Sequence, residues 1–240
     1  MNCISVEGLV KSFNGVRALD GLTFSVECGD SVALLGPNGA GKTTTMRIIA
    51  GLLKSDSGVV KVCGFDVIKE PKKAKACLGY LPEDAAPFMN LTVRENLEYV
   101  GLVRGLSNIK DAVEWVSQTL GLNGLMSVRP SSLSRGNRQR VALAMAIIHR
   151  PKVLLLDEPL NYLDIPTQEN VVELLLSMRR EGTTMLISTH IMSVAERLTN
   201  RVIMINRGRL VWEGSISELM MLVKPGERIE ETVARMLKEA

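Results

Sequence analysis

A glycine-rich segment, Gly36-Pro-Asn-Gly-Ala-Gly-Lys-Thr43, fits the pattern G-x-x-x-x-G-K-[ST]. Glycines in such a loop let successive backbone N–H groups turn toward a phosphate chain, and the following helix presents its positive end to the same phosphates. Lys42 would reach the β- and γ-phosphates, and the Thr43 hydroxyl would be a ligand of Mg²⁺, which prefers oxygen ligands. The alternative is an ordinary glycine turn that caps a helix. The predicted phosphate-contacting residues are Gly36, Pro37, Asn38, Gly39, Ala40, Gly41, Lys42, Thr43 and Thr44.

Two acidic residues, Asp157 and Glu158, directly follow the apolar run 153–156. Carboxylates at the carboxyl end of a buried parallel strand lie at the edge where such sheets bind ligands. Asp157 would hold the Mg²⁺ shell, and Glu158 would orient or deprotonate a water that attacks the γ-phosphorus. Acids at strand ends are often only helix caps or solvated charges. Together with the glycine-rich loop, they predict hydrolysis of ATP to ADP and phosphate, with ATP and Mg²⁺ as cofactors.

The elements around these residues alternate between strand and helix patterns. The apolar run 31–35 predicts a buried strand before the glycine-rich loop, and residues 42–52 have helical spacing after it. Short β-rich runs at 4–10 and 22–26 predict a small β layer at the start of the chain. After Pro151 we expect strands at 153–156, 184–188, 202–205 and 210–213, with helices at 167–180 and 192–198.

Residues 92–150 are wholly helical in pattern and interrupt this alternation. We therefore expect one domain over residues 1–220, with an inserted helical subdomain at about 90–150. The segment 221–240 predicts a short C-terminal helical extension, because Ile229, Val233, Met236 and Leu237 share one helical face.

Charge and hydropathy limit the classes of partner. The chain has 29 basic and 26 acidic residues and no basic block, so its charge gives no indication of nucleic-acid binding. The first residues lack a basic segment followed by an apolar one, which predicts no secretory signal. No apolar run approaches the roughly 18 residues that span a bilayer, so we expect membrane contact only through a partner.

The four cysteines, Cys3, Cys28, Cys63 and Cys77, are scattered and form no C-x-x-C pair. Only two histidines could complete a metal site with them. This pattern favours plain buried thiols in a reducing cytoplasm.

A third motif, Leu133-Ser-Arg-Gly-Asn-Arg-Gln-Arg140, stands before a predicted helix and ahead of Asp157. With it, about residues 4–219 resemble the ATP-binding subunits of ABC transporters. The resemblance implies an α/β P-loop NTPase of the ABC type: a RecA-like core sheet with an N-terminal antiparallel β layer and an inserted helical subdomain. It also implies a homodimer formed head to tail with ATP, in which Ser134 and Gly136 contact the γ-phosphate bound by the opposite subunit. A lone Ser-x-Gly at a helix start would usually be only a cap.

Other positions match the family's motifs one by one. Phe13 occupies the place of the aromatic that stacks on adenine, although it could instead be a core residue. His190 resembles the family's switch histidine beside the γ-phosphate, and Asp164 matches the loop that reaches across the dimer. Glu83 stands where many members have a glutamine near Mg²⁺ and the attacking water, so we expect it to be both a metal-site and a catalytic residue.

Four further positions, Arg135, Asn137, Leu160 and Tyr162, depart from the family pattern without removing a charged catalytic group. The third motif reads Ser-Arg-Gly-Asn where Ser-Gly-Gly-Gln is usual. Leu160 and Tyr162 occupy places that are commonly small or polar. We expect these changes to affect the rate of ATP hydrolysis and the geometry of the dimer.

The resemblance further implies a transmembrane permease on a separate chain and a position at the inner face of the cell membrane, with the exporter-like members the most similar. In the loop 84–90, Phe88 and Met89 could contact the permease or could pack inside the helical subdomain. Two rival functions remain open from the sequence: a soluble ABC ATPase acting on ribosomes or DNA ends, and a regulatory subunit that binds ATP without turnover. The complete set Lys42, Glu158 and His190 favours turnover.

Overall fold

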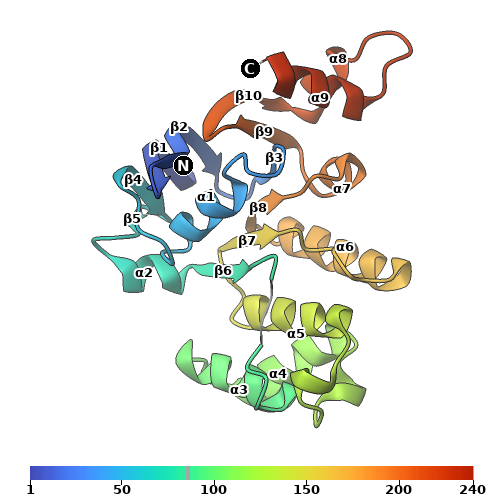
Figure 1. Ribbon diagram of the computed structural model, residues 1–240. Helices are drawn as coiled ribbons and strands as arrows, with labels where there is room; N and C mark the ends of the chain where they lie inside the picture. The colour runs from blue at the N-terminus through green and yellow to red at the C-terminus, as the bar shows by residue number, and fades with distance from the viewer. Residues whose placement is uncertain (85–86, 240) are drawn as a thin grey trace.

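The structure is a computed structural model that describes residues 1–84 and 87–239. Its N-terminal part is an antiparallel sheet in the order β2-β1-β4-β5 (Figure 1). The strands are β1 (Asn2–Phe13), β2 (Val16–Glu27), β4 (Ser57–Val62) and β5 (Phe65–Asp66). Asn14 and Gly15 join β1 to β2 with φ of 47° and 81°. An Asn-Gly pair accepts such angles in a tight hairpin, which is why both strands run longer than the sequence predicted.

The central sheet has the order β10-β9-β3-β8-β7-β6, and all neighbouring strands are parallel except β10 and β9. It comprises β3 (Ser31–Leu35), β6 (Leu78–Leu81), β7 (Val153–Asp157), β8 (Thr184–Ser188), β9 (Arg201–Asn206) and β10 (Arg209–Ser215). Every residue of β3, β7 and β8 is buried, as expected for apolar strands covered on both faces. The predicted fold class is confirmed.

Helix α1 (Lys42–Ile49) lies between the two sheets. Met46 and Ile49 belong to the same buried cluster as residues of both sheets, among them Ile4 and Leu34. The helical pattern predicted to residue 52 ends earlier, because the chain turns at Gly51 with a φ of 65°. The loop before α1 is therefore held by a helix that is itself fixed from both sides.

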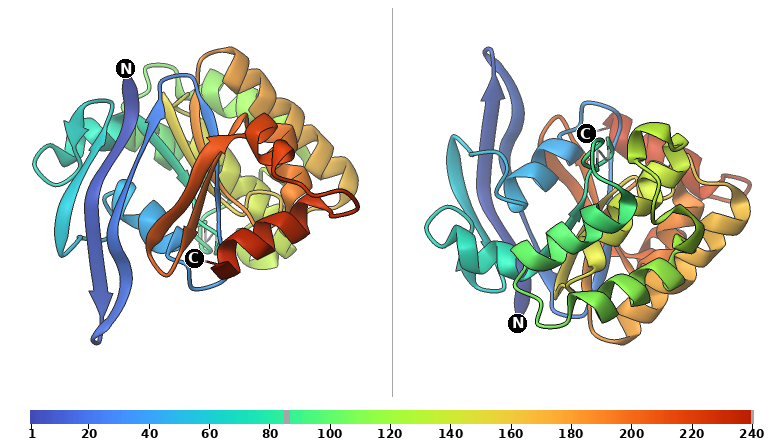
Figure 2. Two further views of the ribbon diagram at one scale, coloured as in Figure 1. Left: turned by 90° about the horizontal axis from the view of Figure 1, so that it is seen from above. Right: turned by 90° about the horizontal axis from the view of Figure 1, so that it is seen from below.

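The predicted helical stretch contains α3 (Val93–Val103), α4 (Ile109–Thr119) and α5 (Arg135–Ile147), with short 3₁₀ turns at Asn123–Leu125 and Pro130–Ser132. Thr92 and Glu95 form a capping box at the start of α3. The three helices gather at one end of the molecule (Figure 2, right), where Leu97, Val116 and Leu143 share one core cluster. The division of the chain into domains stays a prediction.

The remaining helices are α2 (Pro71–Ala76), α6 (Ile165–Arg180), α7 (Met192–Leu198), α8 (Ile216–Met221) and α9 (Ile229–Glu239). The apolar face predicted for the last segment packs against β9 and belongs to a core cluster that also includes residues of α7. The Asn206 side-chain amide donates to the Leu237 carbonyl at 2.8 Å. Among the described residues, no helix combines the length and the hydropathy needed to cross a bilayer.

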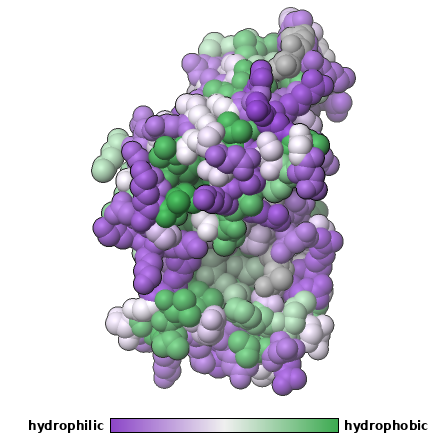
Figure 3. Space-filling model, turned by 60° about the vertical axis from the view of Figure 1, so that its left-hand side comes forward, coloured by the Kyte–Doolittle hydropathy of each residue, from purple (hydrophilic) through white to green (hydrophobic). Residues whose placement is uncertain are grey.

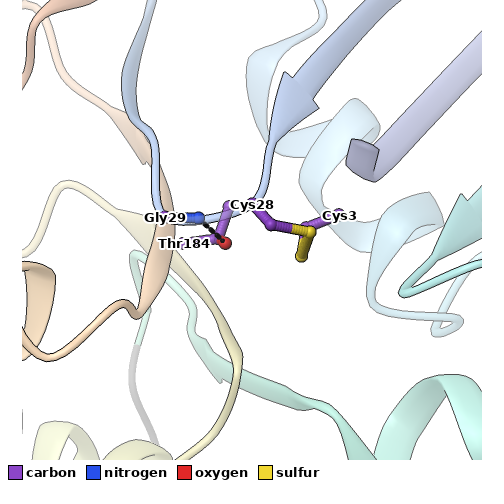
Figure 4. Close-up of a disulfide and its surroundings, with 4 residues drawn as sticks. All are labelled: Cys3, Cys28, Gly29 and Thr184. Carbon is purple, nitrogen blue, oxygen red and sulfur yellow. Dashed lines mark hydrogen bonds between the residues drawn. A yellow bond between two sulfur atoms is a disulfide. The ribbon is translucent and has the colours of Figure 1, made fainter. Parts of the chain in front are cut away.

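Cys3 and Cys28 form a disulfide, so the expectation of four free thiols is wrong for this pair (Figure 4). The two cysteines are neighbours because β1 pairs with β2 and sets Asn2 opposite Glu27. A hydrogen bond from the Cys28 N–H to the Met1 carbonyl at 3.0 Å extends this pairing. Cys63 and Cys77 are free and half-buried, as expected. Burial and a hydrogen bond with Cys77 raise the pKa of Cys63 to about 11, which makes an unreactive thiol.

Replacing both Cys3 and Cys28 by serine is expected to lower the free energy of unfolding by about 3 kcal/mol. The physical reason is that the bond joins residues 25 apart and so restricts the unfolded chain. Thermal melting should show a midpoint lower by roughly 6 to 12 °C, and adding a reductant should have the same effect on the unmodified protein. The control is Cys63→Ser with Cys77→Ser, which keeps the disulfide: it should melt near the unmodified protein and should still lose stability when a reductant is added. A melting point unaffected by reductant would contradict the bond's stabilising role.

Candidate active site

The glycine-rich loop has its fixed shape because neighbouring backbone presses against it. A Cβ on Gly36 would lie 2.3 Å from the Ile205 carbonyl, and one on Gly41 would lie 2.6 Å from a Leu19 methyl carbon. Gly41 also has a φ of 106°, a backbone conformation that L side chains rarely adopt. These glycines are therefore required by close packing behind the loop as well as by backbone access in front of it.

The turn between β9 and β10 supports the loop from behind, which the sequence did not predict. The Gly208 N–H donates to the Ala40 carbonyl at 2.9 Å, and the Asp20 N–H donates to the Gly208 carbonyl at 3.0 Å. A Cβ on Gly208 would lie 2.5 Å from the Ala18 carbonyl oxygen. The only local signal was a glycine between two short strands, and that marks a turn without saying what the turn contacts.

Lys42, the first residue of α1, points its ammonium group back into the loop. Its Nζ donates to the Gly36 carbonyl at 2.7 Å and to the Pro37 carbonyl at 3.2 Å. Burial lowers the pKa of Lys42, and the carboxylates of Glu158, Asp157 and Glu83 act in the opposite direction. Asp157 and Glu158 are adjacent at the end of β7 and Glu83 lies on another segment, so carboxylates from two parts of the chain act on Lys42.

Asp157 and Glu158 end β7, and both are buried in spite of their charge. Asp157 is 1% exposed, and its Oδ2 has no hydrogen-bond partner among the residues that the structure describes. Glu158 is 7% exposed, and its N–H donates to the Ser188 carbonyl at 3.0 Å. Glu158 also has a φ of 50°, which is uncommon for a residue other than glycine and is typical of functional sites.

The Glu158 carboxylate is held by two donors on the segment that follows β8. His190 Nδ1 lies 2.7 Å from Glu158 Oε1, and the Thr189 hydroxyl donates to Oε2 at 3.3 Å. When the Glu158 carboxylate is ionised it can only accept, so His190 Nδ1 is then the donor of this pair. His190 is largely exposed while Glu158 is not, so the acid is fixed in the wall of the site by a histidine at its mouth.

A cavity of about 630 Å³ collects these groups. Of the residues predicted from sequence, it is lined by Phe13, Gly36, Pro37, Asn38, Gly39, Gly41, Lys42, Thr43, Thr44, Glu83, Asp157, Glu158 and His190. Ala40 is buried behind the loop and does not line it. Ala18 and Ser188 line it without having been predicted. Phe13 is 44% exposed at the cavity edge, so the core reading of this residue is wrong.

The polar groups of the cavity fit Mg²⁺. Ser188 Oγ, like Asp157 Oδ2, is buried without a hydrogen-bond partner in the described part of the chain, and Thr43 lines the same cavity. In the described ranges no cluster of three or more His, Cys, Asp or Glu residues could hold a metal ion. A site with one carboxylate and hydroxyl groups suits an ion that keeps several waters and takes further ligands from substrate phosphates.

Three predicted residues, Ser134, Gly136 and Asp164, lie outside this cavity. Ser134 caps α5 by accepting from the Asn137 N–H at 3.3 Å, and Asp164 caps α6 by accepting from the Thr167 N–H at 2.9 Å. The hydrogen bonds from Thr167 lower the pKa of Asp164. None of the three therefore contributes to the site that its own subunit encloses.

Known proteins similar to this chain are ATP-binding subunits of ABC transporters. The profile of the ABC transporter family matches residues 19–161. The chain is 39% identical over 207 residues to the ABC transporter ATP-binding protein NatA of Bacillus subtilis, covering 85% of this chain and 84% of that protein. It is 36% identical to the Nod factor export ATP-binding protein I of Paraburkholderia xenovorans, covering 90% and 72% of the two chains.

Solved structures agree with the fold. An ATP-binding subunit of an ABC transporter has a TM-score of 0.89 at 27% identity, with 98% of this chain and 99% of that chain covered. A dimeric bacterial ABC transporter cassette has a TM-score of 0.82 at 27% identity, with 89% and 98% covered.

Proposed function

The chain belongs to the ABC transporter family and is an ATP-binding ATPase, and from that premise we propose that it powers export through a separate permease chain. The observation that carries the proposal is the single cavity that joins the phosphate loop to the buried Glu158 and its partner His190. Relatives support the direction of transport: one is named for Nod factor export and another, from Streptomyces peucetius, for daunorubicin and doxorubicin resistance.

Each part of the cavity has a distinct task in this proposal. Phe13 stacks on the adenine, and the loop N–H groups with Lys42 bind the phosphates. Thr43, Asp157 and Glu83 would hold Mg²⁺, which would supply positive charge against the β- and γ-phosphates. Glu158 accepts the proton of the attacking water, and His190 keeps the Glu158 carboxylate aimed at that water.

The position of Ser134, Gly136 and Asp164 supports a shared site. Because none of them lines the cavity of its own subunit, their proposed contacts to nucleotide require a second copy of the chain. We propose a head-to-tail homodimer that forms with ATP and opens after hydrolysis. In this arrangement each ATP lies between the phosphate loop of one subunit and α5 of the other.

The permease has a candidate docking groove beside the helical part. A cavity of about 910 Å³ lies between α2, α3 and α5, and apolar side chains gather around the hollow in this face (Figure 3). Phe88 lines it, is 49% exposed and meets the Tyr99 ring edge-on at 5.1 Å. The reading of Phe88 and Met89 as core residues is wrong, since Met89 is also 40% exposed. Residues 85 and 86 of the same loop lie outside the described residues.

The double substitution Phe88→Ser with Met89→Ser is expected to abolish co-purification with the permease, while basal ATPase activity and melting temperature stay unchanged. Exposed apolar side chains contribute little to the folded monomer but contribute strongly to a buried interface. Of the substituted pair Phe88 lines the groove and Met89 is its exposed neighbour; the matched control is Met220→Ser with Met221→Ser, an exposed pair on α8, a helix with no residue in the groove. A stable variant that still binds the permease would exclude the groove assignment.

The function itself is tested by reconstitution at the cytoplasmic face of the membrane, where we propose that the protein is peripheral. The permease is sought in the neighbouring reading frame and purified together with this chain. Release of phosphate from Mg·ATP, stimulated by the permease, is the expected result. Turnover by the isolated chain with no binding to any membrane protein would leave the ATPase standing and overturn the transport role.

A further inference from the structure

Two of the residues that depart from the family pattern, Arg135 and Tyr162, contact each other. The guanidinium carbon of Arg135 lies 3.5 Å from the centroid of the Tyr162 ring. Arg135 is the first residue of α5, and Tyr162 lies in the loop between Glu158 and α6. The two departures therefore form one stacked cation–π pair, in which a flat guanidinium covers an aromatic face.

The backbone at Tyr162 also contacts the start of α5. Tyr162 has a φ of 67°, an uncommon conformation for a bulky residue. A Cβ on Gly136 would lie 2.4 Å from the Tyr162 carbonyl oxygen, so the turn at Gly136 and the loop at Tyr162 are in direct contact. The stack itself is accessible to solvent, since Tyr162 is 45% exposed.

A third segment joins the pair more weakly. Arg135 Nη2 lies 3.4 Å from Asp84 Oδ1, and the two side chains are 55% and 85% exposed. Ion pairs at such exposure contribute little because water screens them. Asp84 follows Glu83, which lines the nucleotide cavity. The stack on Tyr162 is therefore the stronger of the two contacts made by Arg135.

The two segments that the stack joins, the start of α5 and the loop after Glu158, serve different sites in the proposed dimer. Ser134 directly precedes Arg135 and would contact the nucleotide bound by the partner. Glu158 begins the loop that holds Tyr162 and acts on the nucleotide of its own subunit. A second link between them is Gln139 of α5, which is 3% exposed and whose side-chain amide lies 3.5 Å from the Glu158 carbonyl.

We propose that Arg135 and Tyr162 form a positioning pair that couples the two ATP sites of the homodimer. The stack fixes the turn at Ser134 against the loop at Glu158, so a shift of Ser134 on a partner's nucleotide moves the loop that carries the subunit's own base. This inference rests on the proposed homodimer. Neither residue lines its own cavity, so neither contributes to ATP binding by the monomer.

The test compares Arg135→Ala, Tyr162→Ala and the double variant in the full chain. Each single variant is expected to weaken ATP-driven dimer formation about three- to tenfold, the range of one partly exposed cation–π contact. The Hill coefficient of turnover against ATP should fall toward one, and monomer affinity for ATP should stay unchanged. The double variant should be no worse than either single one, because both remove the same contact.

Two control variants distinguish coupling of the two ATP sites from misfolding and from the loss of any cation–π stack. Tyr162→Phe keeps the ring and should behave as the unmodified protein. Arg150→Ala removes a similar stack, in which the Arg150 guanidinium lies 4.3 Å from the Trp115 ring centroid outside the nucleotide cavity. That variant should keep the Hill coefficient and the dimer affinity.

The outcomes are distinguishable. Additive losses in the double variant, an unchanged Hill coefficient in Arg135→Ala, or the same loss in Arg150→Ala would each overturn the coupling. If the unmodified chain does not hydrolyse ATP and the Glu158→Gln variant does not form a dimer with ATP, the proposed dimer itself fails. A melting curve for each variant identifies any that do not fold. If Tyr162→Ala does not fold, the Hill coefficients of Tyr162→Phe and Arg135→Ala decide whether the stack couples the two sites.

Discussion

Glu158→Gln is expected to lower ATP turnover about 100- to 1,000-fold while leaving ATP binding intact. An amide has nearly the same shape as the carboxylate but cannot accept the proton of the attacking water, and general-base catalysis of this kind contributes roughly two to four orders of magnitude. His190 and Thr189 lie at 2.7 and 3.3 Å from the carboxylate oxygens, so the side chain is held in place for that task. Phosphate release and nucleotide affinity are measured separately.

The same variant should trap the proposed dimer, because hydrolysis would no longer remove the nucleotide placed between the two subunits. Light scattering of Glu158→Gln at micromolar concentration should show a monomer without ATP and a dimer with it. The control is Glu169→Gln, an exposed acid that pairs with Arg197 away from the cavity and should leave turnover unchanged. Normal turnover in Glu158→Gln would remove the base assignment, and a monomer at saturating ATP would remove the shared-site dimer for the isolated chain.

Lys42→Ala is expected to weaken ATP binding about 10- to 100-fold and to abolish measurable turnover. Its ammonium group is a buried donor at the centre of the phosphate loop, and hydrogen bonds to charged groups carry about 1.5 to 3 kcal/mol. A fluorescent ATP analogue measures the affinity, and phosphate release measures the turnover. Arginine at this position is not expected to rescue, since its planar fork does not fit a site shaped for a compact ammonium.

The matched control for Lys42→Ala is Lys69→Ala, whose side chain is 82% exposed and lines no part of the nucleotide cavity. It should bind and hydrolyse ATP as the unmodified protein does. Wild-type affinity and turnover in Lys42→Ala would mean that the loop holds phosphate through its backbone alone.

The sequence predicted those parts of the site that are contiguous. The phosphate loop and the pair Asp157 and Glu158 each stand in one short motif, so residue type and spacing were enough to place them. Ser188 was missed, because a serine at the end of a strand has no distinguishing neighbour. The disulfide was missed for a similar reason: Cys3 and Cys28 become neighbours only when β1 pairs with β2.

The fold was predictable where apolar spacing is long and uninterrupted. Strands β3, β7 and β8 and helix α6 follow such patterns, and they lie within a few residues of the expected bounds. The strands β4, β5 and β6 and the helices α2 and α8 have two to six residues each, too few for one period to stand out. The stack of Arg135 on Tyr162 appeared in the sequence only as two unrelated departures.

The support behind the phosphate loop constrains the order in which the molecule can be completed during synthesis. The loop ends at Thr43, yet its back wall is the Ile205 carbonyl and the turn at Gly208. Strand β3, which carries the loop, also lies between β8 and β9, both from the last quarter of the chain. The ribosome must therefore translate about 160 further residues before the segments that support the phosphate loop exist. Until then the nascent chain contains the phosphate-loop motif but cannot form the folded nucleotide-binding site.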